Sequence, residues 1–377
     1  MNTTWRQCTI GDVCDTISNT YNSNAQQVVL INTSDVLEGK VLNHIYIPNE
    51  NLKGQFKKTF EEGDILYSEI RPQNKRYAYI DFAPINYIAS TKLMVIRNKN
   101  IVKSKYLYYF LQSDKIISEL QMLAETRSGT FPQITFNELS KLSIKIPPLP
   151  EQDRIISILD SICKKIDINQ QINDNLEEQA KALFKSWFVD FDRNEWVHCE
   201  LGDITLITAG GDRPSKYTNK KTIECHVPIY SNGIDNEGLY GYTNVAKIHE
   251  ESITISARGT IGYVCLRLEP YVPIVRLISI IPNKKELSAK YLYLWALTQN
   301  ITGTGTTQQQ LTVPIFRKTP ISIPSDTKLK QFNSIADPLF SQIESNKKEN
   351  IKLSALRDTL LPKLMSGELS VEEVSFD

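Results

Sequence analysis

Residues 146–188 read IPPLPEQDRIISILDSICKKIDINQQINDNLEEQAKALFKSWF, and this stretch decides the fold. Beyond its prolines, apolar and amide residues recur at alternating spacings of four and three, with charged residues between them. A stripe of this period, held for more than four heptads, predicts one long helix that packs along a single face. The stripe consists of Ile155, Leu159, Ile162, Ile166, Asn169, Asn173, Leu176, Ala180, Leu183 and Trp187.

The same stripe recurs 177 residues later without a gap, and both pairs of asparagines fall at matching places. An internal duplication explains this recurrence. The second copy contains Pro338, which removes a helical hydrogen bond and clashes with the preceding turn. The second helix therefore either kinks at Pro338 or begins there with Asp337 as its cap, a turn or two shorter than the first. The second stripe consists of Phe332, Ala336, Leu339, Ile343, Asn346, Asn350, Leu353, Arg357, Leu360 and Leu364.

The segment before the first stripe has the pattern of an α/β domain. Short apolar runs bounded by Gly, Asn and Pro predict strands. A helix is expected over Lys105–Ile117, with Ser104 as its N-cap, and a short one around Phe136–Leu139. The expected strands are Val28–Ile31, Ile65–Ile70, Tyr77–Phe82, Leu93–Ile96 and Leu142–Ile146.

A second domain opens at Trp196 and repeats the first in outline. Lys-Tyr-Leu-Tyr occurs at 105–108 and again at 290–293, and Gly11-Asp12 is echoed by Gly202-Asp203. The fold class is therefore α/β, with two similar domains alternating with two long helices. We expect the first domain at 1–146, the first helix and a hinge at 147–195, the second domain at 196–323, and the second helix with a tail at 324–377.

The composition favours an ordinary globular chain. Of its 377 residues 41% are hydrophobic, no apolar run approaches about 20 residues, and MNTTWRQCTI lacks the pattern of a signal peptide. The six scattered cysteines form no CxxC, which favours the reducing cytoplasm. The net charge is zero, but 1–150 and 196–322 each carry an excess of three positive charges, and the two striped regions are acidic. This distribution permits phosphate contacts by the two domains.

The motifs that would predict an enzyme are absent. The sequence has no GxxxxGK[ST] loop, no strand-linked GxGxxG, no HExxH and no GxSxG. Gly259–Tyr263 is interpreted as a strand turn. We therefore expect no catalytic residue, no metal site and no cofactor of its own.

What remains is polar loop chemistry that suits base edges and phosphates. Arg71–Arg76 packs three cations and two amides into six residues, and Arg or Lys pairs with guanine as Asn or Gln does with adenine. The alternative interpretation is an exposed hairpin loop there and flexible loops elsewhere. The candidate DNA-binding residues are Arg71, Gln73, Asn74, Lys75, Arg76, Thr130, Gln133, Arg213, Lys216, Asn232, Arg258, Thr307, Gln308 and Gln309.

With these motifs in view, the chain resembles the specificity subunits of Type I restriction–modification systems over essentially its whole length. The resemblance is carried by IPPLPEQDRI at 146–155, LFKSWFVDF at 183–191, LLPKLMSGEL at 360–369 and GTFPQIT at 129–135. The segment Ile323–Asp326 departs from the pattern, because it lacks the second proline and the Glu-Gln of the first copy.

The resemblance implies a DNA-reading adaptor without catalytic activity. Each α/β domain would recognise one half of a bipartite site on double-stranded DNA, and the long helices would pair as an antiparallel coiled coil under pseudo-twofold symmetry. Two methyltransferase subunits using S-adenosylmethionine, and restriction subunits driven by ATP with magnesium, would be the partners; no membrane is expected. The acidic helix faces would meet the methyltransferase. The alternatives are a coiled-coil scaffold whose domains bind protein, and a specificity module that works in restriction without a methylating partner.

Antiparallel pairing would place the asparagines opposite one another. Full overlap pairs positions whose numbers sum to 519, so that Asn169 faces Asn350 and Asn173 faces Asn346. Buried amides at such positions cost stability and fix the register. A helix of about 38 residues spans roughly 57 Å, and half-sites about 34–36 Å apart lie on one face of the duplex. The helices are therefore expected to set the unread spacer.

Overall fold

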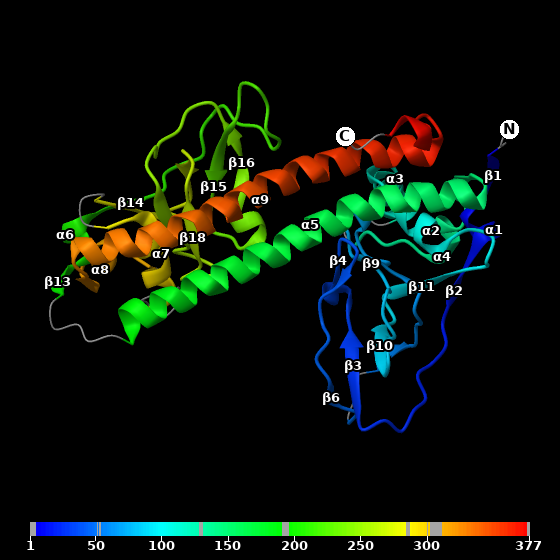
Figure 1. Cartoon of the computed structure of the whole chain (residues 1–377). Helices are drawn as coiled ribbons and strands as arrows, with labels where there is room; N and C mark the ends of the chain where they lie inside the picture. The colour runs from blue at the N-terminus through cyan, green and yellow to red at the C-terminus, as the bar shows by residue number, and fades with distance from the viewer. Residues whose placement is uncertain are drawn as a thin grey trace. The chain divides into compact units, whose positions relative to one another are not determined.

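A computed structural model describes residues 5–50, 52, 54–127, 131–190, 196–283, 287–299, 301 and 311–374. Contacts divide the chain into two units. Unit 1 consists of Met1–Ile168 with Glu349–Asp377, and unit 2 is Asn169–Lys348. The division falls within the two longest helices of Figure 1, α5 (Leu149–Phe184, green) and α9 (Asp326–Ser366, orange to red), which contribute to both units.

Unit 1 is built on two four-stranded sheets. The first has the order β2-β11-β8-β9 with antiparallel pairing throughout, and β8 is buried at all four positions. The second has the order β6-β3-β10-β7, and its central pair β3 and β10 is parallel. The four expected strands that fall in these sheets are confirmed, with ends that differ by a few residues. The strands are β1 (Arg6–Thr9), β2 (Cys14–Ile17), β3 (Gln27–Ile31), β4 (Val36–Leu37), β5 (Lys40–Val41), β6 (Ile47–Pro48), β7 (Phe56–Lys58), β8 (Ile65–Ser68), β9 (Tyr77–Tyr79), β10 (Tyr87–Ser90), β11 (Leu93–Asn98) and β12 (Ser143–Ile146), which pairs with β1.

Unit 2 repeats this topology. Its four-stranded sheet has the order β14-β20-β17-β18, its second sheet has three strands in the order β16-β15-β19 with β15 and β19 again parallel, and β13 pairs with β21 as β1 does with β12. The internal duplication is therefore confirmed at the level of strand order. The strands are β13 (Val197–Glu200), β14 (Thr205–Ala209), β15 (Val227–Tyr230), β16 (Leu239–Thr243), β17 (Ser252–Ile255), β18 (Val264–Arg267), β19 (Val272–Pro273), β20 (Ile278–Pro282) and β21 (Pro320–Ile323).

Short helices complete each unit. Each KYLY motif lies on a helix of its unit's apolar core, α2 or α7, whose aromatic side chains are largely buried because each packs between the sheet and a long helix. The short helices are α1 (Ile10–Val13), α2 (Ser104–Leu111), α3 (Asp114–Arg127) and α4 (Phe136–Leu139) in unit 1, and α6 (Leu201–Ile204), α7 (Ala289–Leu297) and α8 (Val313–Arg317) in unit 2.

A duplicated ion pair docks each domain on the long helix that follows it. Lys105 of α2 lies 2.7 Å from Asp160 of α5, and Lys290 of α7 lies 2.7 Å from Asp337 of α9. The two aspartates are 177 residues apart, the offset of the two stripes. Asp160 also accepts a hydrogen bond from the Tyr109 hydroxyl. The pairing therefore belongs to the duplicated unit rather than to one copy.

The long helices pack through the expected stripes. Every stripe position is buried or half-buried. In unit 2, the Asn346 side-chain amide donates to Asn173 Oδ1 over 2.8 Å, and the rings of Trp187 and Phe332 are 6.4 Å apart. Both contacts join positions whose numbers sum to 519, which is the antiparallel register. In unit 1, Asn350 Nδ2 donates to the Ile166 carbonyl, 3.3 Å away. The predicted pairing of Asn169 with Asn350 stays a prediction.

Two local expectations for the first copy are wrong. The helix expected over Lys105–Ile117 is two helices, because Ser113 hydrogen-bonds back to the Phe110 carbonyl and its own carbonyl then receives the Ile117 amide as the next helix starts. Ser104 is not the N-cap of α2, since Lys103 holds that position. In the second copy, Ser288 does cap α7 and accepts from the Tyr291 amide.

The second long helix neither begins at Pro338 nor is shorter than the first. It begins at Asp326 and has 41 residues, against 36 in α5, which a π-helical turn containing Trp187 continues over Lys185–Val189. Ala336 and Phe340, on either side of the proline, are both buried in the unit 2 core. This burial offsets the roughly 3 kcal/mol that a proline costs inside a helix. Asp337 is thus an ion-pair partner of Lys290 and not a cap.

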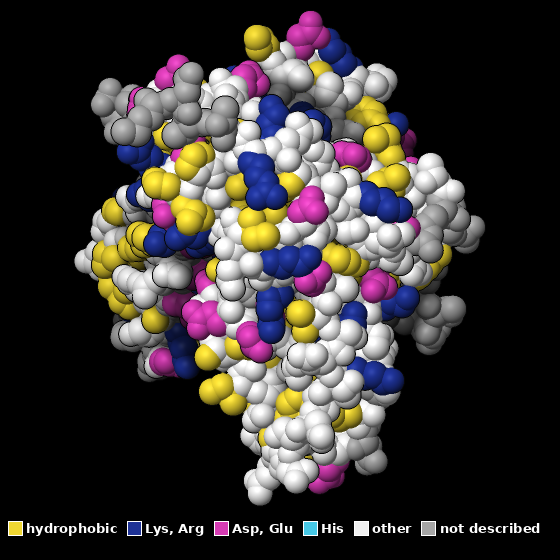
Figure 2. Space-filling view, turned by 90° about the vertical axis from the view of Figure 1, so that its right-hand side faces the viewer, with side chains coloured by type: hydrophobic (Ala, Val, Ile, Leu, Met, Phe, Trp, Pro, Cys, Tyr) yellow, Lys and Arg dark blue, Asp and Glu magenta, His cyan; other side chains and the backbone are white. Residues whose placement is uncertain are grey.

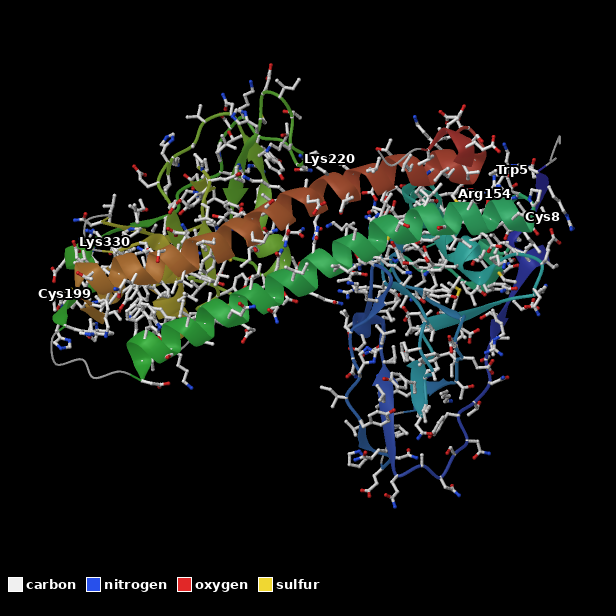
Figure 3. The ribbon with its side chains drawn as sticks, in the orientation of Figure 1. Trp5, Cys8, Arg154, Cys199, Lys220 and Lys330 are labelled. Carbon is white, nitrogen blue, oxygen red and sulfur yellow. The ribbon has the colours of Figure 1, made fainter. Side chains whose placement is uncertain are left out.

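The far end of α9 shows where a glycine is required. Gly367 has φ +74° just beyond the helix, a conformation that other residues rarely adopt, and a Cβ there would lie 3.3 Å from the Trp5 ring. Trp5, Cys8 and Arg154 mark this end of unit 1 in Figure 3. The glycine therefore both ends the helix and makes room for the indole.

Candidate nucleic-acid interface

Three loop segments of unit 1 meet at the end of β8. The Glu69 amide donates to the Lys92 carbonyl over 3.0 Å, the Ile134 amide donates to the Glu69 carbonyl over 2.9 Å, and the Arg71 amide donates to the Pro132 carbonyl over 3.2 Å. We call these segments, Glu69–Arg71, Thr91–Lys92 and Pro132–Ile134, edge 1. They are up to 65 residues apart in sequence, and the hydrogen bonds make them one surface.

Cations and an amide concentrate on edge 1. Lys92 Nζ donates to Gln133 Oε1 over 3.1 Å and lies 3.7 Å from a Glu69 carboxylate oxygen. Beside them, Lys58 Nζ donates to the carbonyls of Thr91 and Leu93. Burial lowers the pKa of the Lys58 ammonium below its usual value. Lys58 therefore braces the Thr91–Lys92 turn, while Lys92 is exposed and Gln133 is half-buried.

Arg71 is the cation of edge 1 with the freest head group. Its backbone has φ +45°, its side chain is exposed, and its guanidinium has no hydrogen bond or ion pair within the described residues. A non-glycine residue at positive φ is uncommon, and such strain clusters at functional sites. Arg71 is the best placed of the sequence candidates in unit 1.

The rest of the Arg71–Arg76 segment divides into exposed and internally bonded residues. Pro72–Asn74 forms one 3-10 turn, on which the side chains of Gln73 and Asn74 are exposed. Lys75 lies 3.2 Å from Asp114. Arg76 donates to the carbonyls of Ser34 and Val36, so it ties a neighbouring loop to β9 and is half-buried. Thr130 lies outside the described residues.

Unit 2 has the matching surface, edge 2, which consists of Ala257–Arg258, the turn Ile274–Leu277 and Leu311. The Leu311 amide donates to the Ala257 carbonyl over 3.2 Å. This bond is the counterpart of the one from Ile134 to Glu69. Asn232 joins two of the segments, because its Oδ1 accepts from the Ala257 amide and its Nδ2 donates to the Val275 carbonyl. Asn232 thus braces the fold with both ends of its amide. Arg258 is half-buried.

Two other candidates of unit 2 lie on a separate loop. The Arg213 guanidinium stacks 4.0 Å above the Tyr217 ring and donates to the Tyr240 hydroxyl, and it stays exposed. Lys216 lies 2.7 Å from Glu224, and this hydrogen bond lowers the pKa of the carboxyl below its usual value. Arg213 thus lies over the Tyr217 ring beside Tyr240, whose ring is tilted by 39° to that of Tyr217. Thr307, Gln308 and Gln309 lie outside the described residues.

Sequence reasoning missed Lys58, Lys92 and Arg276. Each is an isolated cation, without the clustering that drew attention to Arg71–Arg76. The internal duplication could have indicated two of these cations. The Thr91–Lys92 turn comes just before β11, and the turn that contains Arg276 comes just before β20, at the equivalent place in the second domain. Aligning the strands of the two halves would have paired the two turns.

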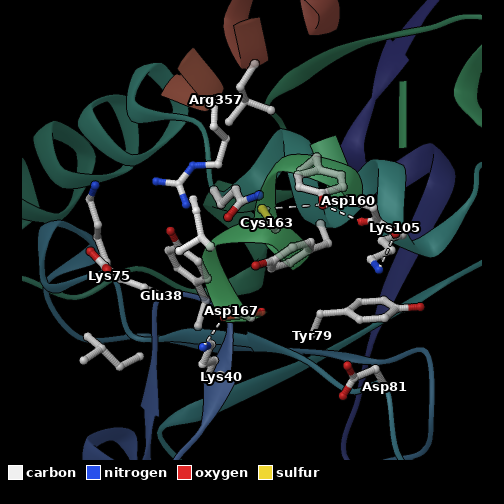
Figure 4. A pocket seen from close by; sticks show the side chains of 18 of the residues that line it. Glu38, Lys40, Lys75, Tyr79, Asp81, Lys105, Asp160, Cys163, Asp167 and Arg357 are labelled. Atoms are coloured by element: carbon white, nitrogen blue, oxygen red, sulfur yellow. Dashed lines mark hydrogen bonds and ion pairs between the residues drawn. The ribbon is translucent and has the colours of Figure 1, made fainter. Parts of the chain in front are cut away.

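A cavity of about 760 Å³ lies in unit 1 between the β4–β5 hairpin, α2 and the long helices (Figure 4). Most of the charged groups at its wall are already paired: Lys40 with Asp167, Lys75 with Asp114, Lys105 with Asp160 and Arg357 with Asp358. Because these pairs neutralise one another, the wall offers a bound ligand little net charge.

The described part of the chain contains no group of three His, Cys, Asp or Glu side chains placed to hold a metal. Among the same residues, none of the helices is both long and apolar enough to cross a membrane. On the face drawn in Figure 2, Lys and Arg side chains alternate with Asp and Glu and with apolar groups, so the positive charge there is dispersed.

Comparison with known proteins shows the family of this chain. The family model of the Type I restriction modification DNA specificity domain matches residues 2–178 and 193–355. The specificity subunit of the Type I restriction enzyme HindI of Haemophilus influenzae is 33% identical, over 97% of this chain and 99% of its own length. The specificity subunit of the Type I restriction enzyme MjaIX of Methanocaldococcus jannaschii is 29% identical, over 78% of this chain and 77% of its own length. The crystal structure of a Type I restriction-modification system S subunit from M. genitalium is similar in fold, with a TM-score of 0.53. The two chains are 18% identical, and the match covers 97% of this chain and 96% of the other.

Proposed function

We propose that this chain, because it belongs to the Type I restriction modification DNA specificity family, is the DNA-reading subunit of a Type I restriction–modification complex. It would recognise a bipartite duplex sequence, with edge 1 reading one half and edge 2 the other. The observation that carries this proposal is that one edge hydrogen bond recurs, from Ile134 to Glu69 in unit 1 and from Leu311 to Ala257 in unit 2, and that each edge carries an exposed arginine at positive φ, on a different segment in each unit. Two equivalent reading surfaces on one chain are what a bipartite target requires.

Catalysis would belong to the partners. Two methyltransferase subunits would bring S-adenosylmethionine, and restriction subunits would bring ATP and magnesium, to DNA that this chain has selected. The acidic faces of α5 and α9 are the surfaces proposed to meet the methyltransferase. The six free thiols suit a reducing cytoplasm.

The function is tested by retention of DNA. The chain is co-purified with its methyltransferase subunit, and the methylome of a strain that carries the system supplies the target sequence. In a gel-shift assay the complex is expected to retain a duplex with both half-sites at least about 1,000-fold more tightly than a scrambled duplex. Equal retention of the two duplexes would reject the proposal and favour the scaffold alternative.

We also propose that the paired helices set the spacer between the half-sites. The 36 residues of α5 span about 54 Å. Asn173 and Asn346 are buried and hydrogen-bonded in the middle of the pair. A polar layer in an apolar seam restricts the register, because any shift breaks the hydrogen bond between the two side-chain amides and sets both against apolar side chains.

Replacing both Asn173 and Asn346 with leucine is expected to raise the free energy of unfolding by about 1–4 kcal/mol, since a buried polar pair is exchanged for apolar packing. At the same time the complex should accept duplexes whose spacer differs by a base pair or more. Calorimetry measures the first effect and a spacer series the second. A variant that is more stable and keeps one strict spacer would show that the asparagines do not set the register.

A further inference from the structure

The turn Ile274–Leu277 of edge 2 has an unusual backbone. Val275 has φ +53° and Arg276 has φ +59°, so two consecutive residues other than glycine are left-handed. A β-branched residue in this region is an outlier, because its Cβ substituents crowd the backbone. Such strain persists only where the surrounding structure enforces it.

The surrounding structure enforces it through Gly210 and Gly211. The Arg276 amide donates to the Gly210 carbonyl over 2.9 Å, the Val275 amide to the Gly211 carbonyl over 2.9 Å, and the Gly210 amide to the Leu277 carbonyl over 2.8 Å. A Cβ on Gly210 would lie 2.7 Å from the Ile274 nitrogen, so only glycine allows this approach. Asn232 adds a bond to the Val275 carbonyl over 2.6 Å. The turn is therefore held from both sides.

The side chains of the turn are unused by the protein. Val275 is 49% exposed, and Arg276 is exposed too. Among the described residues, the Arg276 guanidinium makes no hydrogen bond or ion pair. Arg267 shows the contrast within the same unit, because it is buried over Tyr230 and bonded to Thr254 and Glu237. A strained turn that is held in place and presents an unpaired, exposed guanidinium is available to a partner outside the chain.

We propose that Arg276 reads a guanine in the major groove of the half-site bound by unit 2. This inference rests on the function proposed above and names the residue that determines specificity at one position. The guanidinium fork matches the O6 and N7 acceptors of guanine, and a pre-organised turn loses little freedom on binding. The exposed Val275 beside it favours base edges over phosphates, since an apolar side chain tolerates a thymine methyl but gains nothing from a phosphate.

The test uses three variants of the full chain assembled with its methyltransferase subunit. Arg276→Gly removes the side chain and suits the positive φ, so it preserves the turn. Arg276→Lys keeps the charge and loses the fork. The matched control is Lys330→Gln, which removes an exposed cation near the start of α9 (Figure 3), a helix that contributes no residue to edge 2. Each complex is challenged with duplexes randomised in both half-sites, at two salt concentrations.

Arg276→Gly is expected to lose about 5- to 150-fold of the preference for guanine at one position of one half-site and Arg276→Lys a smaller part of it, while the other half-site stays unchanged and the control behaves as the wild type. A uniform loss over all sequences, with the salt dependence reduced by about one charge, would mark a phosphate contact and overturn the proposal. Unchanged selection would also overturn it. If the wild-type complex itself selects no bipartite sequence, the proposed function is wrong. This outcome differs from the two above, because it is seen in the wild type and they are seen only in the Arg276 variants.

Discussion

Replacing residues 1–146 with the recognition domain of another family member is expected to change one half of the recognised sequence completely and to leave the other half as it is. The physical reason is that the hydrogen bonds that build edge 1 join residues between Lys58 and Ile134. Edge 2 is built in the same way within Gly210–Leu311. Each reading surface therefore travels with its own domain.

The measurement is the methylome, or the duplexes selected from a library, of the exchanged chain. The reciprocal exchange of residues 196–323 is the matched control and should change the other half. The junctions follow strands β12 and β21, which end at Ile146 and Ile323. If either exchange alters both halves, the assignment of one half-site to each domain is wrong.

Arg97→Ala is expected to lower the free energy of unfolding by about 3–5 kcal/mol, because it leaves the Asp64 carboxylate buried without its counter-ion. The Asp64 side chain is 2% exposed, and Arg97 binds it with two hydrogen bonds of 2.7 Å. The pKa of Arg97 is raised, first by this hydrogen bond, so the guanidinium stays charged. The carboxylate also accepts the Glu61 amide and thereby holds the loop before β8.

The comparison variant is Lys103→Ala, which removes a pair with Asp153 whose side chains are about half exposed. That change should cost less than about 1 kcal/mol, since water screens the pair. A second variant, Arg97→Met with Asp64→Asn, removes both charges and is expected to recover most of the loss. Chemical denaturation measures all three. If Arg97→Ala and Lys103→Ala are equally stable, Asp64 is not buried as described.

The long helices and the internal duplication could be predicted from the sequence, because they depend on local periodicity. A stripe at spacings of four and three needs no knowledge of the rest of the chain, and the spacing of 177 residues between its copies also located the register of Asn173 with Asn346. The α/β class followed from short apolar runs in the same way. That the second helix continues through Pro338 could not be predicted from the sequence. This continuation depends on the burial of Phe340 and Ala336 in a core built from distant strands.

The reading surfaces were decided by the tertiary structure. Arg71 and Arg76 belong to one hexapeptide, and the sequence does not distinguish their roles. In the fold, Arg71 is exposed at positive φ, whereas Arg76 donates hydrogen bonds to two backbone carbonyls of a neighbouring loop. Lys92 and Arg276 are isolated cations in the sequence. Backbone hydrogen bonds to distant segments place their turns beside the other segments of edge 1 and edge 2. By itself the sequence determined the helices, the repeat and the family, because these follow from periodicity and motif. Only the folded chain determined which cations face outward, because that choice depends on which carbonyls and carboxylates the packing brings within reach.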